Sequence, residues 1–189
     1  MSIVLAVRKD NKTVIAADTV HFYGSHRETA DNVVGCSKIR KFGSTFIGSV
    51  GWAAYDDIMA HYFKSLKRPP LLKNKAAIFT FFLKLWRAMR ERYQVVNDQP
   101  ESSDSPFADL DSNFLVVNRY GIFEVSSDLS VTQYSKYVAI GSGNEYAFGA
   151  LYAIYGGKRS AERIAITAAE AAAYNDKSCG GEIEWYALP

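Results

Sequence analysis

The sequence predicts an α+β fold in which two β-sheets lie face to face between two pairs of helices, a four-layer αββα sandwich. Three observations predict it. Short apolar strand patterns occur at both ends and in the middle of the chain, helical patterns occur in two adjacent pairs, and turn residues separate the strands. At 189 residues, with no sign of a second hydrophobic core, the chain is expected to form one domain over residues 1–189.

Composition narrows the function classes. Hydrophobic residues make up 48% and charged residues 22%, which is typical of a globular protein, and a net charge of +2 argues against nucleic acid or an anionic membrane as partner. The two cysteines and three histidines are scattered, so neither a disulfide scaffold nor a zinc site is expected. No apolar stretch approaches the roughly 20 residues that cross a bilayer, and no secretory signal is visible. We expect a cytoplasmic protein without cofactor or metal.

The start of the chain predicts a hairpin of two buried strands. Apolar, largely β-branched runs at residues 3–7 and 13–16 flank a polar turn at residues 8–12, and Asp18 follows the second run. The first residues of a domain are normally poorly ordered. A core strand at this position therefore indicates that the terminus itself is held rigidly in a site.

Ser2 is a candidate nucleophile at that terminus. Met1 precedes a small residue, so its removal is expected and would leave Ser2 with a free α-amino group. Such an amine has a pKa of about 7.7–8.0, which suits a general base near neutral pH. One residue can therefore supply both nucleophile and base. The alternative is an ordinary N-terminal strand in which Ser2 has no role.

The remaining elements follow from apolar alternation, helical periodicity and turn residues. The expected strands are residues 36–42, 45–51, 112–117, 122–126, 131–134, 137–140 and 182–188, and those from 112 to 140 are expected to form one antiparallel meander. The expected helices are residues 53–66, 75–93, 144–155 and 161–174, the last with Ser160 as its N-cap. Residues 21–35 and 97–109 are expected to be polar loops. The helix at 75–93 has two apolar faces, which indicates cover by the sheet and by a neighbouring helix or subunit.

A terminal serine nucleophile needs a cation, a carboxylate that orients the cation, and a backbone N–H as oxyanion donor. Asp18 at the end of the second strand, Lys38 on a short core-like strand and Gly48 in the next strand are the candidates. Each also has an ordinary structural interpretation: Asp18 as a turn former, Lys38 as a strand lysine with a buried stem, and Gly48 as a bend in the backbone.

Two other motifs carry less weight. The glycines at 141 and 143 precede a helix, but a dinucleotide-binding loop would need a third glycine where Tyr146 stands. Cys36 and Cys179 lack a histidine partner in the sequence and are expected to be small core residues.

Nearly end to end, the chain resembles the N-terminal-nucleophile peptidases of the proteasome β-subunit family, and most of all the bacterial HslV type. The resemblance rests on the opening strand pair with IAAD, the segments SKIRKF, FIGSVG and YVAIGSG, and NDKSCGG before the last strand. In that family a terminal threonine, exposed by processing, is the nucleophile. The resemblance implies the Ntn-hydrolase form of the αββα sandwich, and the matching catalytic positions are Ser2, Asp18, Lys38, Gly48, Ser142 and Asp176.

Two departures from the family pattern stand out. Serine replaces the terminal threonine, which removes the methyl group that fixes the hydroxyl rotamer and keeps the nucleophilic oxygen. Cys179 stands where the family has a serine three residues after the later aspartate.

The resemblance implies a peptidase that acts on peptide substrates in a homo-oligomer. In the family such oligomers include rings, and the resemblance raises an ATP-dependent unfoldase as a candidate partner. Two alternatives remain open at this point: a catalytically inactive, proteasome-like structural subunit, and a non-proteolytic amidohydrolase acting on a small amide.

Overall fold

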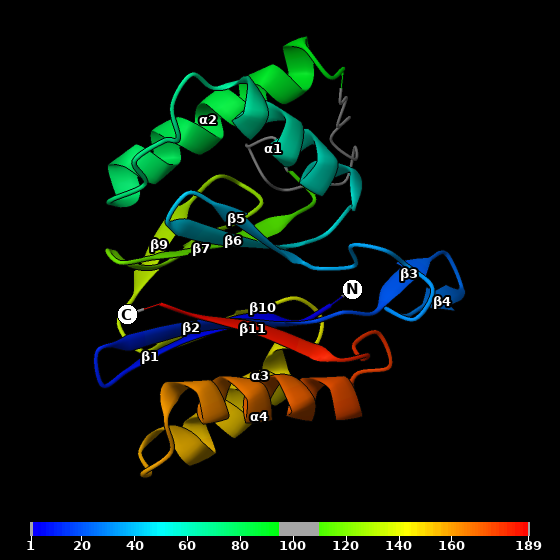
Figure 1. Cartoon of the computed structure of the whole chain (residues 1–189), viewed down its shortest axis with the longest axis vertical. Helices are drawn as coiled ribbons and strands as arrows, with labels where there is room; N and C mark the ends of the chain where they lie inside the picture. The colour runs from blue at the N-terminus through cyan, green and yellow to red at the C-terminus, as the bar shows by residue number, and fades with distance from the viewer. Residues whose placement is uncertain (1, 95–109, 189) are drawn as a thin grey trace.

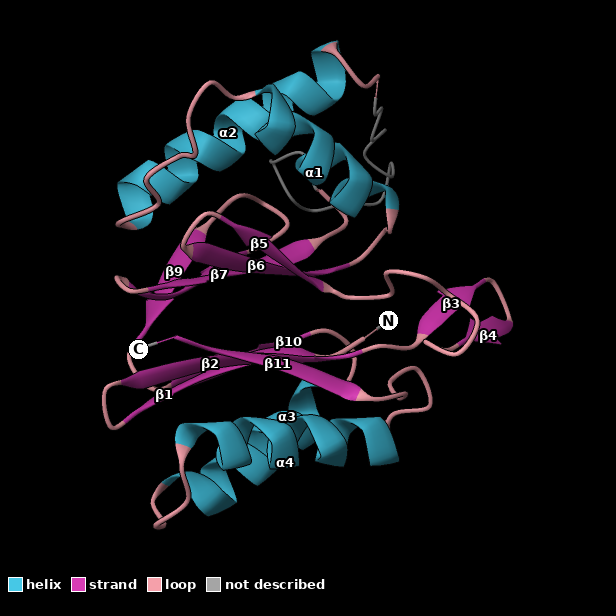
Figure 2. Ribbon diagram, viewed as in Figure 1, coloured by secondary structure: helices cyan, strands magenta, loops and turns pink. Residues whose placement is uncertain are grey.

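Two β-sheets stack face to face, and a pair of helices covers the outer face of each (Figures 1 and 2). The computed structural model describes residues 2–94 and 110–188. This arrangement confirms the predicted four-layer αββα sandwich. The predicted polar loop at 97–109 lies outside the described residues.

The first sheet holds the chain's opening hairpin at its centre. Its strand order is β10-β1-β2-β11. The strands are β1 (Val4–Lys9), β2 (Lys12–Asp18), β10 (Tyr137–Ile140) and β11 (Ile183–Leu188). The turn between β1 and β2 is tighter than predicted, because only Asp10 and Asn11 form it, both with positive φ (49° and 59°). Two residues with positive φ make a type I′ turn, whose twist matches that of the flanking strands.

The second sheet is an antiparallel meander in sequence order, β5-β6-β7-β8-β9. Its strands are β5 (Ile39–Phe42), β6 (Thr45–Val50), β7 (Asn113–Asn118), β8 (Gly121–Val125) and β9 (Val131–Tyr134). The prediction that the meander continues to residue 140 is wrong, because β10 leaves this sheet and pairs with β1. Residues 138–140 are all buried, and only a place beside the central strand of the other sheet covers both faces of such a strand.

A small hairpin replaces part of the loop predicted at 21–35. Its strands β3 (His21–Tyr23) and β4 (His26–Glu28) belong to neither main sheet and project from one end of the sandwich (Figure 1). Strands of only three residues are too short to show apolar alternation, so the sequence carried no signal for them.

The helices fall where the sequence predicts, within two residues at each end. They are α1 (Ala54–Ser65) and α2 (Lys75–Glu91) on the second sheet, and α3 (Asn144–Tyr155) and α4 (Ala161–Asn175) on the first. Ser160 caps α4 as predicted, since its side chain accepts a hydrogen bond from the Arg163 N–H. The second apolar face of α2 is only partly covered within the chain, because Phe79 is 45% exposed. No helix in the described part of the chain is long and apolar enough to cross a membrane.

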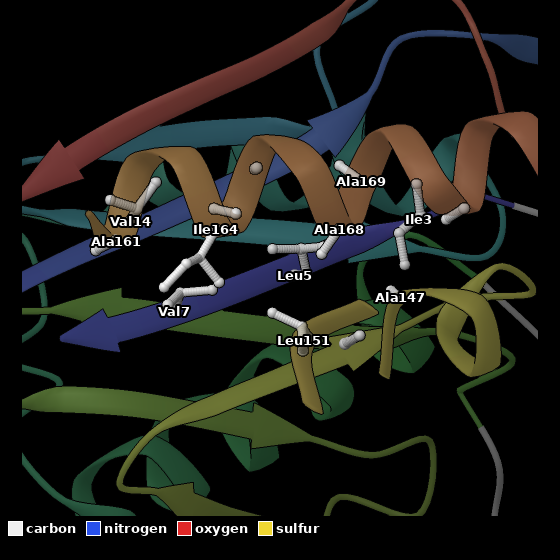
Figure 3. Packing of buried hydrophobic residues seen from close by; sticks show 14 of the residues in the cluster. Ile3, Leu5, Val7, Val14, Ala147, Leu151, Ala161, Ile164, Ala168 and Ala169 are labelled. Carbon is white, nitrogen blue, oxygen red and sulfur yellow. The ribbon is translucent and has the colours of Figure 1, made fainter. Parts of the chain in front are cut away.

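Both faces of β1 are buried, which fixes the start of the chain. Ile3, Leu5 and Val7 pack against α3 and α4 (Figure 3), whereas Val4 and Ala6 point into the core between the sheets. The alanines of α4 let that helix approach the sheet closely, since Ala168 and its neighbours bring little bulk to the contact. Ser2, which precedes the buried residues 3–7, therefore has a fixed position at one end of the sandwich.

Candidate active site

Ser2 is held against the turn that joins β10 to α3. It is 7% exposed, its backbone N–H donates to Ser142 Oγ at 3.2 Å, and its carbonyl accepts from the Gly143 N–H at 3.4 Å. Gly141 has a φ of +103°, and a Cβ there would lie 2.1 Å from the Ser2 carbonyl oxygen. The glycine is required at this position, because a side chain would push the strand terminus away from the turn.

Asp18 and Lys38 form a buried ion pair beside this terminus. Lys38 Nζ lies 2.7 Å from Asp18 Oδ1, and the two side chains are 6% and 0% exposed. The Lys38 ammonium also donates to the Val20 carbonyl at 2.6 Å. Asp18 accepts two backbone N–H groups as well, from Ile3 at 2.9 Å and Gly180 at 3.0 Å. Since a buried pair is stable only when its remaining hydrogen-bonding capacity is satisfied, these extra contacts hold the lysine in one place.

Ser142 and Asp176 form a second polar group, which contacts the Ser2 backbone N–H. Burial raises the pKa of Asp176, but hydrogen bonds from Ser142, the Ser178 N–H and Cys179 outweigh it, so the pKa lies below its usual range. The Ser178 N–H lies 2.9 Å from one carboxylate oxygen, and Cys179 Sγ lies 3.3 Å from the other. Asp176 thus reaches the chain terminus through the Ser142 hydroxyl, which accepts the Ser2 N–H.

Cys179 is buried next to these carboxylates. Burial, the charge of Asp18 and the hydrogen bond to Asp176 raise the pKa of its thiol to about 12. The thiol is therefore protonated at neutral pH and is a poor nucleophile. This agrees with the prediction that Cys179 is a small core residue, whereas the same prediction is wrong for Cys36, which lies in the loop before β5 and is only partly buried.

A cavity of about 460 Å³ opens on Ser2 and Lys38. Its other walls are residues 20–24, which lead from β2 through the β3–β4 hairpin, and residues 49–54 with Asp56, which lead from β6 into α1. The volume lies within the usual range of small-molecule and side-chain pockets. The described residues contain no group of three or more His, Cys, Asp or Glu that could hold a metal ion.

Gly48, the predicted oxyanion donor, does not line this cavity. It lies inside β6, paired with Ile39 on one side and Leu115 on the other. A Cβ on Gly48 would lie 2.5 Å from Val4 Cγ1, so the glycine is needed for close packing between the sheets. The structure brings together the other five predicted residues, and it replaces Gly48 with Gly51 as the glycine at the cavity.

Gly51 follows the end of β6 and lines the cavity together with Ser2. Its φ is +136°, and a Cβ would lie 2.1 Å from Ser112 Oγ and 2.5 Å from the Asp111 carbonyl. Only glycine fits here, and it leaves a stretch of backbone without a side chain at the cavity wall. The sequence signal was the last glycine of FIGSVG, which the strand prediction treated only as a stop.

Sequence reasoning also missed Asp56, a carboxylate in the first turn of α1 that lines the same cavity. Gly180, whose N–H fixes Asp18, was missed as well. Neither carries a local signal, because both reach the site only through tertiary contacts.

No protein-family model and no curated protein sequence matches this chain. Among solved structures, the Thiobacillus denitrificans bacterial proteasome homologue BPH is similar both free and in complex with epoxomicin. In each case the identity is 34%, the TM-score is 0.91, and the match covers 98% of this chain and 97% of the other. The HslV of Trypanosoma brucei shares the fold, with a TM-score of 0.67 at 19% identity over 98% of both chains. Given 34% identity over almost the whole of both chains, together with the same fold, this protein belongs to the proteasome β-subunit and HslV-like family of N-terminal-nucleophile hydrolases.

Proposed function

We propose that this chain is a proteasome-type peptidase whose nucleophile is the Ser2 hydroxyl, exposed when Met1 is removed. The observation that carries the proposal is the position of Ser2, at the wall of a cavity that is also lined by Lys38, whose ammonium is paired with the buried Asp18. A fixed cation next to a hydroxyl stabilises the alkoxide that forms when the proton leaves.

The proposed reaction begins when the Ser2 hydroxyl gives its proton to the Ser2 α-amine and its oxygen attacks an amide carbonyl. The Gly51 N–H, in place of the expected Gly48, stabilises the tetrahedral oxyanion, while the Lys38 ammonium supplies positive charge. When the intermediate collapses, the C–N bond breaks, the leaving amine takes the proton, and an ester remains on Ser2. Water then attacks this ester and the α-amine accepts the water proton. As the ester C–O bond breaks and the carboxylic acid leaves, the α-ammonium returns that proton to the Ser2 oxygen and restores the hydroxyl.

The remaining polar residues act as positioning residues in this scheme. Asp18 holds Lys38 through the 2.7 Å contact and holds the first strand through the Ile3 N–H. Ser142, which is hydrogen-bonded to Asp176, lies 3.2 Å from the Ser2 nitrogen and so orients the amine that serves as base.

The test uses an epoxyketone such as epoxomicin, the compound bound to the similar Thiobacillus protein. Its ketone and epoxide offer two electrophilic carbons, which suit a hydroxyl and an amine on one residue. Intact-mass measurement should show loss of Met1 and one inhibitor per chain, and peptide mapping should place the adduct on Ser2. Ser2→Ala should form no adduct, whereas Ser44→Ala, an exposed serine in the turn before β6, should react like the unmodified chain.

The outcomes separate the alternatives. A trimmed chain that forms no adduct and cleaves no peptide would show that the protein is a structural subunit. An adduct on Ser2, together with cleavage of small amides and not of peptides, would show a non-proteolytic amidohydrolase. We also propose that the active form is a homo-oligomer, which native mass spectrometry measures directly; added unfoldase candidates test the possible ATP-dependent partner.

A further inference from the structure

Asp56 places a carboxylate in the wall of the cavity that opens on Ser2. It lies in the first turn of α1 and is half-buried. The Ser49 hydroxyl donates a hydrogen bond to Asp56 Oδ1, which fixes the orientation of the side chain. Asp56 is the only carboxylate among the described residues that line this cavity.

Asp56 has no close cationic partner in the described part of the chain. The ion pairs found there join Lys12 to Glu162, His26 to Glu28 and Lys38 to Asp18, and none includes Asp56. A desolvated carboxylate without a cation is costly, and a bound cation offsets that cost.

The electrostatic surroundings of Asp56 agree with this geometry. Burial raises its pKa, and this effect outweighs the hydrogen bond from Ser49 and the more distant positive charges of Arg40 and His21. The neighbouring Asp57 raises the pKa further. The carboxylate therefore sits in a site where its charge is insufficiently compensated.

The basic side chains in the cavity wall, His21 and Lys38, are already engaged: His21 Nε2 lies 2.8 Å from the Cys36 carbonyl oxygen. The Lys38 ammonium is bound by Asp18 and by the Val20 carbonyl. The remaining walls are largely apolar or uncharged, and Val20, Ala53 and Trp52 are among them. Such walls suit the methylene stem of a long cationic side chain, whose charged end would then meet Asp56.

We propose that this cavity binds a lysine or arginine side chain of the substrate, with Asp56 as its counter-ion. The inference rests on the proposed function and deepens it, because it names the substrate class. The residue concerned is the one whose carbonyl carbon Ser2 attacks. Its Cα is bonded to the attacked carbon, so its side chain must lie within reach of the cavity that opens on Ser2.

The experiment compares two fluorogenic peptide amides that differ only in the residue before the reporter group, which is arginine in one and citrulline in the other. Citrulline has nearly the shape of arginine and no charge, so the ratio of the two kcat/KM values isolates the charge. A hydrogen-bonded charge pair in a partly buried site predicts a ratio of roughly ten to a hundred in favour of arginine. Asp56→Asn should bring the ratio close to one. Because both peptides are measured on the same sample, loss of folded protein cancels from the ratio.

Asp57→Asn is the matched control, since Asp57 is the next residue of α1, is exposed and does not line the cavity. It should keep the unmodified ratio. Equal cleavage of the arginine and citrulline peptides by the unmodified protein would overturn the assignment of Asp56 and leave the peptidase function standing, as would a ratio that Asp56→Asn does not change. If neither these peptides nor leucine or glutamate analogues are cleaved and Ser2 takes no epoxyketone, the proposed function itself fails.

Discussion

Replacing Asp18 with asparagine tests whether the buried ion pair holds the site together. Asp18 is fully buried and accepts hydrogen bonds from Lys38 Nζ at 2.7 Å, the Ile3 N–H at 2.9 Å and the Gly180 N–H at 3.0 Å. Asparagine keeps the shape but replaces one acceptor oxygen with a donor NH₂. That NH₂ group then faces another donor, and the Lys38 ammonium is left buried without a counter-charge.

The expected loss of folding stability is large, although the substitution only replaces one oxygen by an NH₂ group. Removing one partner of a buried ion pair typically costs about 3–5 kcal/mol, because the remaining charge is no longer compensated. Lys12 and Glu162 provide a matched control, since their pair spans 3.2 Å and Lys12 is 60% exposed. Breaking an exposed pair of this kind costs about 0–1 kcal/mol. Glu162→Gln should therefore change the stability much less than Asp18→Asn.

The measurement is urea unfolding followed by tryptophan fluorescence, at one protein concentration for all variants so that any assembly affects them equally. Asp18→Asn should also abolish the reaction of Ser2 with the epoxyketone, even without urea and at low temperature, where most of the protein is folded. If its midpoint shifts no more than that of Glu162→Gln, the pair does not stabilise the fold as argued. If Ser2 still reacts at the unmodified rate, the ion pair is not needed to activate the nucleophile.

Three further predictions follow from the same structure. Because burial raises the pKa of Asp56, the folded state binds its proton more tightly than the unfolded state, so ionisation of this group lowers the stability of the fold as pH rises above about 4. The melting temperature of Asp56→Asn, measured relative to the unmodified chain, should therefore increase between acid and neutral pH. A decrease would contradict the reasoning. Lys9 Nζ donates to the carbonyls of residues 155 and 159 at 3.0 Å and to that of Gly157 at 2.5 Å. Lys9→Met leaves these carbonyls without their donor, so it should lower the free energy of unfolding by roughly 1–3 kcal/mol in a urea titration. No change would show that water replaces the ammonium. Gly48→Ala should lower the free energy of unfolding by about 1–3 kcal/mol, because the added methyl group overpacks against Val4. An unchanged unfolding midpoint would mean that the two sheets separate locally without loss of stability.

Local patterns were sufficient to predict most of the fold. The continuous apolar run of residues 3–7 predicted a strand buried on both faces, and β1 is the strand that both helices and the second sheet cover. The periodicity of residues 75–93 and the cap at Ser160 predicted α2 and α4 with nearly correct ends. These signals are local, since burial on one or both faces fixes the spacing of apolar residues within each element.

The sequence by itself also pointed to Ser2, Asp18 and Lys38 as candidate site residues, because the buried opening hairpin and the segments IAAD and SKIRKF match the pattern of the family. Only the tertiary structure decided between Gly48 and Gly51, since both are glycines of the same short segment. A Cβ on Gly48 would lie 2.5 Å from Val4 of the other sheet, whereas Gly51 lines the cavity, and strand register sets which glycine takes which place. The tertiary structure alone placed Asp56 in the wall of the cavity that Ser2 also lines, and it alone assigned β10 to the first sheet, because both depend on contacts between segments far apart in the chain.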